Sequence, residues 1–305
     1  MRVLLIGATG LLGRVLQEEW EGDAVTGVGS RDADIRDESQ VCQLFERNRP
    51  EWTVLAAAYA DVDGCERDPQ RAHDVNCTGA MNVARAARDA RSKLLFVSTD
   101  YVFDGSKGAP YNPEDPVCPI NVYGRSKADA EKRMREILPD CCILRTSWLF
   151  GAAGKCFPNK ILALAQNQKK LRVVADQIGR PTYNRDLARV IIPLVRVGAR
   201  GILHAANDDA SSWFDFAGAI LHAAGLSDVA VEAVRTEDVP RPACRPKYSV
   251  LSTTNLEPYG LRMRRWQDTL AGYFADRLKT SNVRQELVSN TAAAVRLQAK
   301  PGEVQ

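Results

Sequence analysis

Short apolar runs alternate with amphipathic segments along the first hundred residues. A run rich in apolar residues at 2–6 ends at a glycine, and residues 11–20 then continue with apolar positions at helical spacing. The two patterns recur, predicting strands at 24–28, 53–57 and 94–98 and helices at 38–47 and 69–90. Asp68 supplies an N-cap and Pro69 a first-turn proline for the last of these helices. Strands separated by helices predict βαβ units around a parallel sheet with both faces covered.

The pattern becomes less regular from about residue 151, where prolines interrupt shorter elements. We therefore expect a doubly wound α/β domain over residues 1–150 and a smaller C-terminal α/β region, mainly over 151–278, that binds substrate. Residues near 184–206, including the apolar segment 202–205, are expected to return to the sheet domain. Residues 279–305 lack a core-like apolar pattern and are expected to form a tail.

Composition restricts the partners that the chain can have. The 305 residues are 45% hydrophobic and 26% charged, and the net charge of +3 comes with scattered arginines, so neither nucleic acid nor a membrane surface is indicated. No apolar run approaches the ~20 residues of a membrane span, and the N-terminal run is too short for a signal peptide, so we expect a cytoplasmic protein. Eight cysteines without a CxxC pair and three widely separated histidines predict no metal site.

A glycine-rich stretch, GATGLLG, follows the first predicted strand and opens the first helix. Its glycines are Gly7, Gly10 and Gly13, and this context is typical of the dinucleotide-binding turn of a Rossmann-type fold. Glycines that merely close a strand-to-helix turn are the alternative. After the second strand the sequence presents Ser30 and Arg31, and an arginine there favours the 2′-phosphate of NADPH. Asp32 and Asp34 nearby leave NADH open.

The stretch YGRSK places Tyr123 and Lys127 four residues apart in a predicted helix, and so on one face. An ammonium near a phenol lowers the pKa of the phenol, which could then exchange a proton with an alcohol or ketone oxygen. A solvated helix face is the alternative, because the pattern is short. The stretch VSTDYVFDG places Thr99 at the carboxyl end of the fourth strand, where open α/β sheets bind ligands.

These motifs occur in the order and spacing of an extended short-chain dehydrogenase/reductase. Within that superfamily the chain resembles the dTDP-4-dehydrorhamnose reductase family over most of its length to about residue 278. The stretches that carry the resemblance are LAAAYADVDGCE (55–66), VSTDYVFDG (97–105), PINVYGRSKADAE (119–131), LRTSWLFG (144–151), DQIGRPTY (176–183) and RPKYSVLSTTNL (245–256).

The resemblance implies an NADPH-dependent oxidoreductase that reduces the C4 ketone of dTDP-4-dehydro-L-rhamnose to dTDP-L-rhamnose. Tyr123 would donate a proton to the C4 oxygen, Thr99 would hydrogen-bond the same oxygen, and Lys127 would bond the nicotinamide ribose and lower the Tyr123 pKa. Donors near the developing alkoxide stabilise the transition state, while the cofactor carries the hydride chemistry. A homodimer is also expected from the resemblance.

Further residues are expected to contact ligands. Beyond the glycines, Ser30, Arg31, Tyr123 and Lys127, those expected at the cofactor are Leu11, Leu12, Asp34, Ile35, Ala58, Tyr59 and Ala60. Those expected at the substrate are Thr99, Asp100, Trp148, Gln177 and Arg180, with Arg245 as an alternative to Arg180. Trp148 would pack against the deoxysugar, whose C–H groups and methyl suit an aromatic face, with an ordinary core tryptophan as the alternative.

The chain departs from the family pattern in two motifs. The usual NAAAYT reads LAAAYA, with Leu55 and Ala60 replacing polar residues, and the usual RPxNS reads RPKYS, with Lys247 and Tyr248. Two other functions therefore stay open. One is a reductase, epimerase or dehydratase acting on another nucleotide sugar. The other is a non-catalytic NADP-binding subunit resembling the regulatory subunit of methionine adenosyltransferase.

Overall fold

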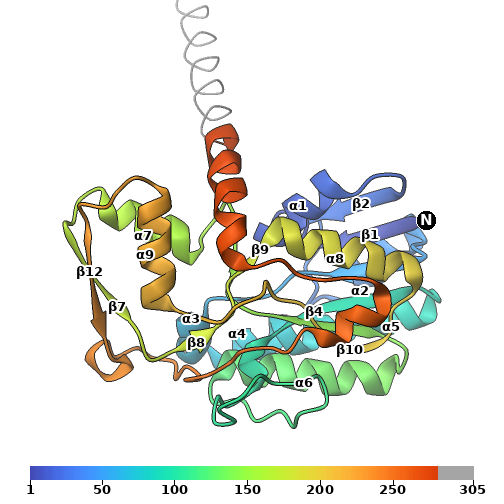
Figure 1. The fold of residues 1–305 in the computed structure, drawn as a ribbon. Helices are drawn as coiled ribbons and strands as arrows, with labels where there is room; N and C mark the ends of the chain where they lie inside the picture. Colours follow the sequence, from blue (N-terminus) through green and yellow to red (C-terminus); the bar gives the residue numbers. More distant parts are fainter. Residues whose placement is uncertain (281–305) are drawn as a thin grey trace, which may run out of the picture.

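The computed structural model describes residues 1–280, and its centre is a six-stranded parallel sheet (Figure 1). The strands of this sheet are β1 (Arg2–Ile6), β2 (Ala24–Val28), β3 (Trp52–Leu55), β4 (Lys93–Thr99), β5 (Cys142–Thr146) and β10 (Gly201–His204). Their order is β10-β5-β4-β3-β1-β2, and all pairs are parallel. The order reverses between β1 and β3, and open α/β sheets bind ligands beyond the strand ends at such a switch point.

Helices cover both faces of the sheet. On one face, α1 (Leu11–Glu19) and α8 (Asn184–Val197) pack together over Val3, Leu5 and Leu144. On the other face, the residues of the core come from α2 (Glu38–Asn48), α5 (Gly79–Asp89) and α6 (Val122–Ile137). The Rossmann-type doubly wound sheet predicted from the sequence is therefore confirmed.

The segment after β3 differs from the single helix predicted at 69–90. It forms α3 (Val62–Arg67), α4 (Pro69–His73), a π-helical turn (Asp74–Thr78) and then α5. The predicted cap is present, because the Asp68 carboxylate accepts a hydrogen bond from the backbone N–H of Arg71. Periodicity alone could not predict the π-turn, which interrupts the helix where the side chain of Asn76 makes long-range hydrogen bonds.

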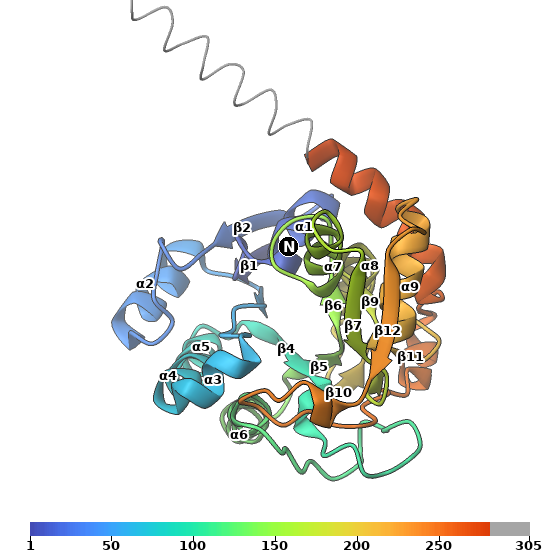
Figure 2. The ribbon, with the colours of Figure 1, turned by 90° about the vertical axis from the view of Figure 1, so that its left-hand side faces the viewer.

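A second unit, which we call the cap, lies beside the sheet domain (Figures 1 and 2). It consists of α7 (Phe157–Ala165), α9 (Trp213–Ala223) and the parallel pair β7 (Lys170–Val174) and β12 (Ala230–Val234). Its own apolar core includes Phe150, Phe216 and Tyr273. Two pairs of short strands adjoin it: β6 (Leu149–Phe150) with β9 (Thr182–Tyr183), and β8 (Ile178–Gly179) with β11 (Ser211–Ser212).

Parts of the chain after residue 150 belong to the sheet. Helix α8 packs on α1, and β10 extends the sheet beside β5. Residues 270–280 form a helix that adds Tyr273 to the core of the cap, while Asp276 pairs with Arg185 of α8 at 2.5 Å. The division of the chain near residue 150 stays a prediction. The expected tail lies outside the described residues from 281 onward. Within residues 1–280, no helix is long and apolar enough to cross a membrane.

Candidate active site

The glycine turn after β1 is shaped by close backbone contacts. Gly7 has φ +97°, and a Cβ on it would lie 2.5 Å from the backbone nitrogen of Ala57, while a Cβ on Gly13 would lie 2.1 Å from the Gly7 oxygen. Gly10 is the N-cap of α1 and has no side chain that could accept a hydrogen bond from the first N–H groups of the helix. These groups also have no acceptor within the helix. A pyrophosphate fits this arrangement, because it accepts such N–H groups and benefits from the helix dipole.

The end of β2 presents the residues that would meet the adenosine half of the cofactor. Ser30 and Arg31 are exposed there, and Arg31 has no ion pair among residues 1–280. Asp34 instead forms a bidentate pair with Arg36, and this hydrogen bonding lowers the pKa of the Asp34 carboxyl. Ile35 is buried against Gly79. The free cation at Arg31 and the engaged carboxylate at Asp34 suit a 2′-phosphate better than a ribose hydroxyl.

Leu11 and Leu12 lie at the start of α1, and Ala58, Tyr59 and Ala60 follow β3 at the same edge of the sheet. Sequence reasoning missed the residue that holds the latter segment, which is Asn76. Its side chain accepts from the Tyr59 N–H at 2.8 Å and donates to the Tyr59 oxygen at 3.1 Å. It also donates to Ser126 Oγ on α6 at 3.0 Å, and Ser126 donates to the Tyr123 oxygen. Asn76 thus ties the loop to the helix that carries Tyr123.

Tyr123 and Lys127 lie on the first turns of α6. Asn121 is the N-cap of this helix, and its side chain accepts a hydrogen bond from the Gly124 N–H. Lys127 is fully buried, and its Nζ donates to the Val97 oxygen at 2.8 Å and lies 3.7 Å from the centroid of the Phe96 ring. Burial lowers the pKa of Lys127 to about 7, although Glu131 opposes this. An ammonium has three donors, so two stay available beyond the bond to Val97.

The predicted lowering of the Tyr123 pKa by Lys127 is wrong for this geometry. Burial raises the pKa of the Tyr123 phenol, and the neighbouring Thr99 hydroxyl opposes this rise. Lys127 is not among the groups that shift this pKa, and its Nζ is directed toward β4, where it donates to the Val97 oxygen. The phenol therefore stays protonated at neutral pH, as a proton donor requires.

Thr99 and Asp100 lie at the end of β4, beside Tyr123. Thr99 Oγ1 donates to Asp100 Oδ1 at 3.1 Å, and Ser249 Oγ donates to Asp100 Oδ2 at 2.6 Å. Asp100 is 2% exposed, and burial raises the pKa of its carboxyl to about 7. Both of its oxygens are engaged by protein groups. The expected contact between Asp100 and substrate stays a prediction.

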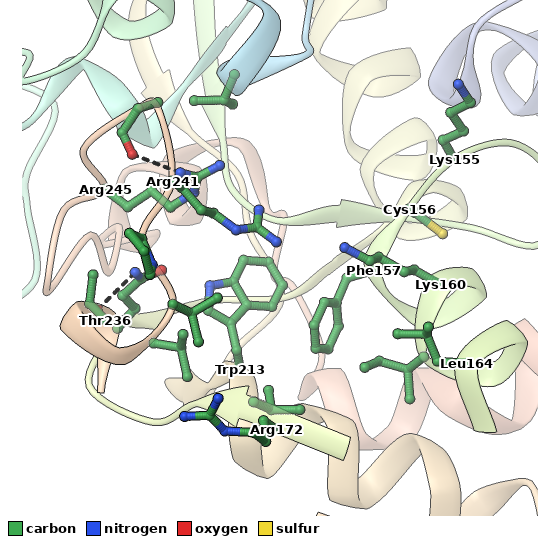
Figure 3. A pocket seen from close by; sticks show the side chains of 18 of the residues that line it. Lys155, Cys156, Phe157, Lys160, Leu164, Arg172, Trp213, Thr236, Arg241 and Arg245 are labelled. Carbon is green, nitrogen blue, oxygen red and sulfur yellow. Dashed lines mark hydrogen bonds between the residues drawn. The ribbon is translucent and has the colours of Figure 1, made fainter. Parts of the chain in front are cut away.

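A cavity of about 900 Å³ lies between the cap and the sheet domain (Figure 3). Tyr101 lines it and connects it to Tyr123, because the two rings make an edge contact at a centroid distance of 6.1 Å. Five cationic side chains line the cavity: Lys155, Lys160, Arg172, Arg241 and Arg245. Asp63 pairs with Arg245 at 2.9 Å and Arg241 at 3.5 Å, whereas the other three have no ion pair within the described residues. The cavity can therefore attract an anionic ligand.

The structure separates the residues that were expected at the substrate. Gln177 lines the cavity and donates to Thr236 Oγ1 at 3.0 Å. Arg180 is directed elsewhere: it pairs with Asp208 at 2.9 Å and does not line the cavity. Its proposed alternative, Arg245, does line the cavity.

Trp148 is half-buried and does not line the cavity. One face of its ring stacks on Trp213, and a Cβ on Gly179 would lie 2.4 Å from its Cε2 atom. Trp213 lines the cavity instead (Figure 3). Sequence reasoning missed Trp213, Lys155, Lys160 and Arg172, although the aromatic at the start of the amphipathic stretch SSWFDFA offered a signal for the first.

The unusual RPKYS segment runs beside β8 and reaches Asp100 at the end of β4. Its backbone bonds to β8, with the Ile178 N–H donating to the Lys247 oxygen at 2.7 Å and the Ser249 N–H donating to the Ile178 oxygen at 2.8 Å. These bonds do not involve the Lys247 and Tyr248 side chains, so substitution there preserves the path of the segment. The serine that reaches Asp100 is retained as Ser249.

Comparisons with known proteins agree with this geometry. Residues 1–279 match the family model described as the RmlD substrate binding domain. The dTDP-4-dehydrorhamnose reductase of Mycolicibacterium smegmatis is 37% identical, over 88% of this chain and 84% of that protein. The spore coat polysaccharide biosynthesis protein SpsK of Bacillus subtilis is 38% identical, over 90% of this chain and 98% of that protein.

A solved dTDP-4-dehydrorhamnose reductase from Bacillus anthracis, in complex with NADP, superposes with a TM-score of 0.87 at 38% identity, covering 90% of this chain and 98% of that one. The match to the family model and the shared length and identity confirm the resemblance described above. The chain therefore belongs to the dTDP-4-dehydrorhamnose reductase family of the extended short-chain dehydrogenases/reductases.

Proposed function

We propose that this chain reduces the C4 ketone of dTDP-4-dehydro-L-rhamnose to the alcohol with NADPH. One observation carries the proposal. Thr99 at the end of β4 and Tyr123 on α6 lie next to a cavity lined by cations, which Tyr101 joins to Tyr123. A nucleoside diphosphate sugar combines a ketone for the pair with a diphosphate for the cations. The names of the relatives support the same substrate class.

The proposed roles follow from the contacts. NADPH supplies the hydride when it is bound. Tyr123 donates its phenolic proton to the C4 oxygen, and Thr99 hydrogen-bonds the same oxygen, so that both stabilise the charge that develops there. Lys127 uses the donors left beyond Val97 to hold the nicotinamide ribose.

The cofactor is proposed to bind along the edge of the sheet at the switch point. The glycine turn would hold the pyrophosphate, and Arg31 would pair with the 2′-phosphate. The segment Ala58–Ala60 would border the nicotinamide half. The Bacillus anthracis relative was crystallised with NADP, which supports the preference for NADPH over NADH.

The diphosphate of the substrate is proposed to bind at the side of the cavity formed by Lys155 and Lys160. They come from the loop before α7 and from α7 itself, while Arg172 comes from β7 (Figure 3). None of these three cations forms an ion pair within the described residues, so a bound diphosphate would not have to displace one. Charge-assisted hydrogen bonds to phosphate are among the stronger polar contacts.

A second candidate is a reductase of another dTDP-4-keto sugar. The dTDP-4-keto-6-deoxy-D-glucose reductase of Streptomyces niveus is 36% identical over 90% of this chain, which is close to the identity of the rhamnose enzymes. The alternative of a non-catalytic regulatory subunit differs from both reductases, because such a subunit would not consume NADPH. The expected homodimer and the cytoplasmic location stay predictions.

The test is to mix the purified chain with enzymatically generated dTDP-4-dehydro-L-rhamnose and follow the loss of NADPH absorbance. Rapid oxidation is expected, with a larger kcat/KM for NADPH than for NADH. Tyr123→Phe should keep cofactor binding and lose a factor of ~100 in kcat, whereas Tyr259→Phe, remote from the cavity, should behave as the wild type. Binding of NADPH without oxidation would favour another sugar or the regulatory role.

A further inference from the structure

The loop at residues 151–155 lies between the two proposed binding sites. It follows β6 and leads toward α7, and its last two residues, Gly154 and Lys155, line the cavity. Gly154 has φ +87°, and a Cβ on it would lie 3.9 Å from Cδ1 of Leu11, the first residue of α1 after the glycine turn. One stretch of five residues therefore lies against the turn proposed for the cofactor and also forms part of the cavity proposed for the sugar.

The loop begins against a second side chain that reaches the glycine turn. Asn184, at the start of α8, donates from Nδ2 to the Leu11 oxygen at 2.8 Å. Gly151 packs on the same side chain so closely that a Cβ on it would lie 2.3 Å from Asn184 Nδ2. A shift of the glycine turn would therefore reach the loop near both of its ends, through Asn184 at Gly151 and directly at Gly154.

Asn159, in the first turn of α7, holds the loop by its backbone. Its Oδ1 atom accepts from the hydroxyl of Tyr273 at 2.8 Å and from Arg277, which both lie in the helix at 270–280. Although Asn159 lines the cavity, both polar atoms of its amide are thus engaged within the protein. Its Nδ2 atom donates at 3.0 to 3.3 Å to three backbone oxygens of the loop, those of Gly151, Ala152 and Gly154.

We propose that Asn159 positions the loop 151–155 as a shared wall of the two sites, so that NADP(H) and the nucleotide sugar each strengthen the binding of the other. Asn159 is a positioning residue, because it acts through the loop that carries Lys155. The inference rests on the proposed function, which places the pyrophosphate of the cofactor at the glycine turn and the diphosphate of the substrate beside Lys155.

The direction of the coupling follows from these contacts. Gly154 and Lys155 are exposed, and in Figure 3 Lys155 lies at the edge of the cavity and extends away from Trp213. Ordering such a loop and a long side chain on a phosphate costs conformational entropy. A pyrophosphate at the first N–H groups of α1 would fix Leu11, and with it the loop that packs there. The second ligand then has less freedom to remove, so it binds more tightly.

The experiment measures the Kd of dTDP by calorimetric titration, without and with saturating NADP⁺, for the wild type and for Asn159→Asp. The wild type should bind dTDP ~10-fold more tightly when NADP⁺ is present. Asn159→Asp keeps an oxygen for Tyr273 and Arg277, but it replaces the amide donor with a second oxygen that repels the loop carbonyls. The ratio of the two Kd values should therefore fall to ~2 or less.

This ratio separates positioning from direct contact with the ligand. The new charge of Asn159→Asp would weaken dTDP binding with and without NADP⁺ alike, so a direct effect leaves the ratio unchanged. Tyr273→Phe is the matched control, because it removes a bond to Oδ1 and keeps the three bonds to the loop, and it should retain the ratio of the wild type. Asn159→Ala also removes the donor and takes the place of Asn159→Asp if that variant does not fold, which thermal unfolding checks.

Equal Kd values for dTDP with and without NADP⁺ in the wild type would overturn the inference. So would an undiminished ratio in the Asn159 variants, or an equal loss in Tyr273→Phe, which would assign the effect to the helix at 270–280. A wild type that binds no dTDP would overturn the coupling together with the proposed diphosphate site. Coupled binding without oxidation of NADPH would instead contradict the proposed reduction alone, and oxidation without coupling would contradict the inference alone.

Discussion

The indole rings of Trp148 and Trp213 stack face to face, with centroids 3.4 Å apart and an angle of 6° between their planes. Trp148 precedes β6 and has a left-handed backbone with φ +45°, and Trp213 begins α9 of the cap. A bulky residue rarely adopts a positive φ, so the surrounding structure must hold Trp148 in place. The stack therefore joins the end of the sheet domain to the wall of the cavity.

A substitution of Gly179 tests whether the stack of Trp148 on Trp213 supports the fold and the cavity. A Cβ there would lie 2.4 Å from Trp148 Cε2, so Gly179→Ala should displace the ring, destabilise the fold by ~1–3 kcal/mol and raise KM for the nucleotide sugar. Denaturant unfolding and the circular dichroism of the tryptophan pair measure the two structural effects. Gly218→Ala is the matched control, because a Cβ there meets open space on α9. Equal stability and equal dichroism for both variants would mean that Gly179 does not support the stack.

Lys160 tests the site proposed for the diphosphate. Lys160→Gln keeps a side chain of similar length but removes the charge, and we expect KM for the sugar to rise ~10-fold while kcat changes by less than ~2-fold. Added salt should weaken substrate binding by the wild type more than by the variant. Lys132→Gln, on the exposed side of α6, serves as the control. Equal KM values for Lys160→Gln and the wild type would place the diphosphate elsewhere.

A substitution of Asn76 tests how the segment Ala58–Ala60, which is proposed to border the cofactor, is held in place. Asn76→Ala leaves the N–H and oxygen of Tyr59 and the hydroxyl of Ser126 without their partner, so we expect a loss of ~1–3 kcal/mol in the free energy of unfolding and a several-fold weaker Kd for NADPH. Unfolding curves and a fluorescence titration with NADPH measure these effects. Asn112→Ala, at an exposed position, should change neither quantity. An unchanged Kd for NADPH would show that Asn76 supports the fold without positioning the segment Ala58–Ala60.

The sequence was sufficient to predict the features that depend on local pattern. The strand endings, the turn at Gly7 and the spacing of Tyr123 and Lys127 each follow from a few neighbouring residues. The direction of a long side chain does not, and Lys127 is directed toward Val97 on another element. The same limit explains Trp148, whose surroundings come from Gly179 and Trp213, and both lie more than 30 residues away in the sequence.

The cavity illustrates the same limit. Lys155, Arg172 and Arg245 are separated by many residues and share no motif, yet the packing of the cap on the sheet domain brings them to one surface. Arg180 shows the opposite case, because it stands in a motif of the family while its partner Asp208 holds it away from the cavity. Tertiary contacts, and not local spacing, decide which arginine is available to a ligand.

His204 should make the fold sensitive to acid. It is fully buried between the Tyr111 oxygen and Arg145, and burial, aided by the charge of Arg145, lowers its pKa from 6.5 to about 3. Between these pH values the unfolded chain binds more protons than the folded one, so stability rises with pH and is lost as the pH falls below 6.5. The loss from this group should reach about 3 kcal/mol by pH 4.

The measurement for His204 is the free energy of unfolding from pH 7 to pH 4. His204→Asn should lower stability at pH 7 but show a shallower decline toward pH 4, since its side chain does not titrate. His222→Asn, which replaces an exposed histidine on α9, should retain the slope of the wild type. A slope for His204→Asn as steep as that of the wild type would assign the acid sensitivity to other groups.

The central claim is that hydride passes from NADPH to the C4 carbon of a dTDP-4-keto sugar at the Thr99 and Tyr123 pair. The most direct measurement uses NADPH with deuterium at both C4 positions of the nicotinamide, and mass spectrometry of the sugar product with dTDP-4-dehydro-L-rhamnose as substrate. We predict dTDP-L-rhamnose carrying one deuterium at C4, formed in equal amount to the NADP⁺, and formed far more slowly by Tyr123→Phe. A product without deuterium, or no product while NADPH stays bound and unoxidised, would contradict the claim.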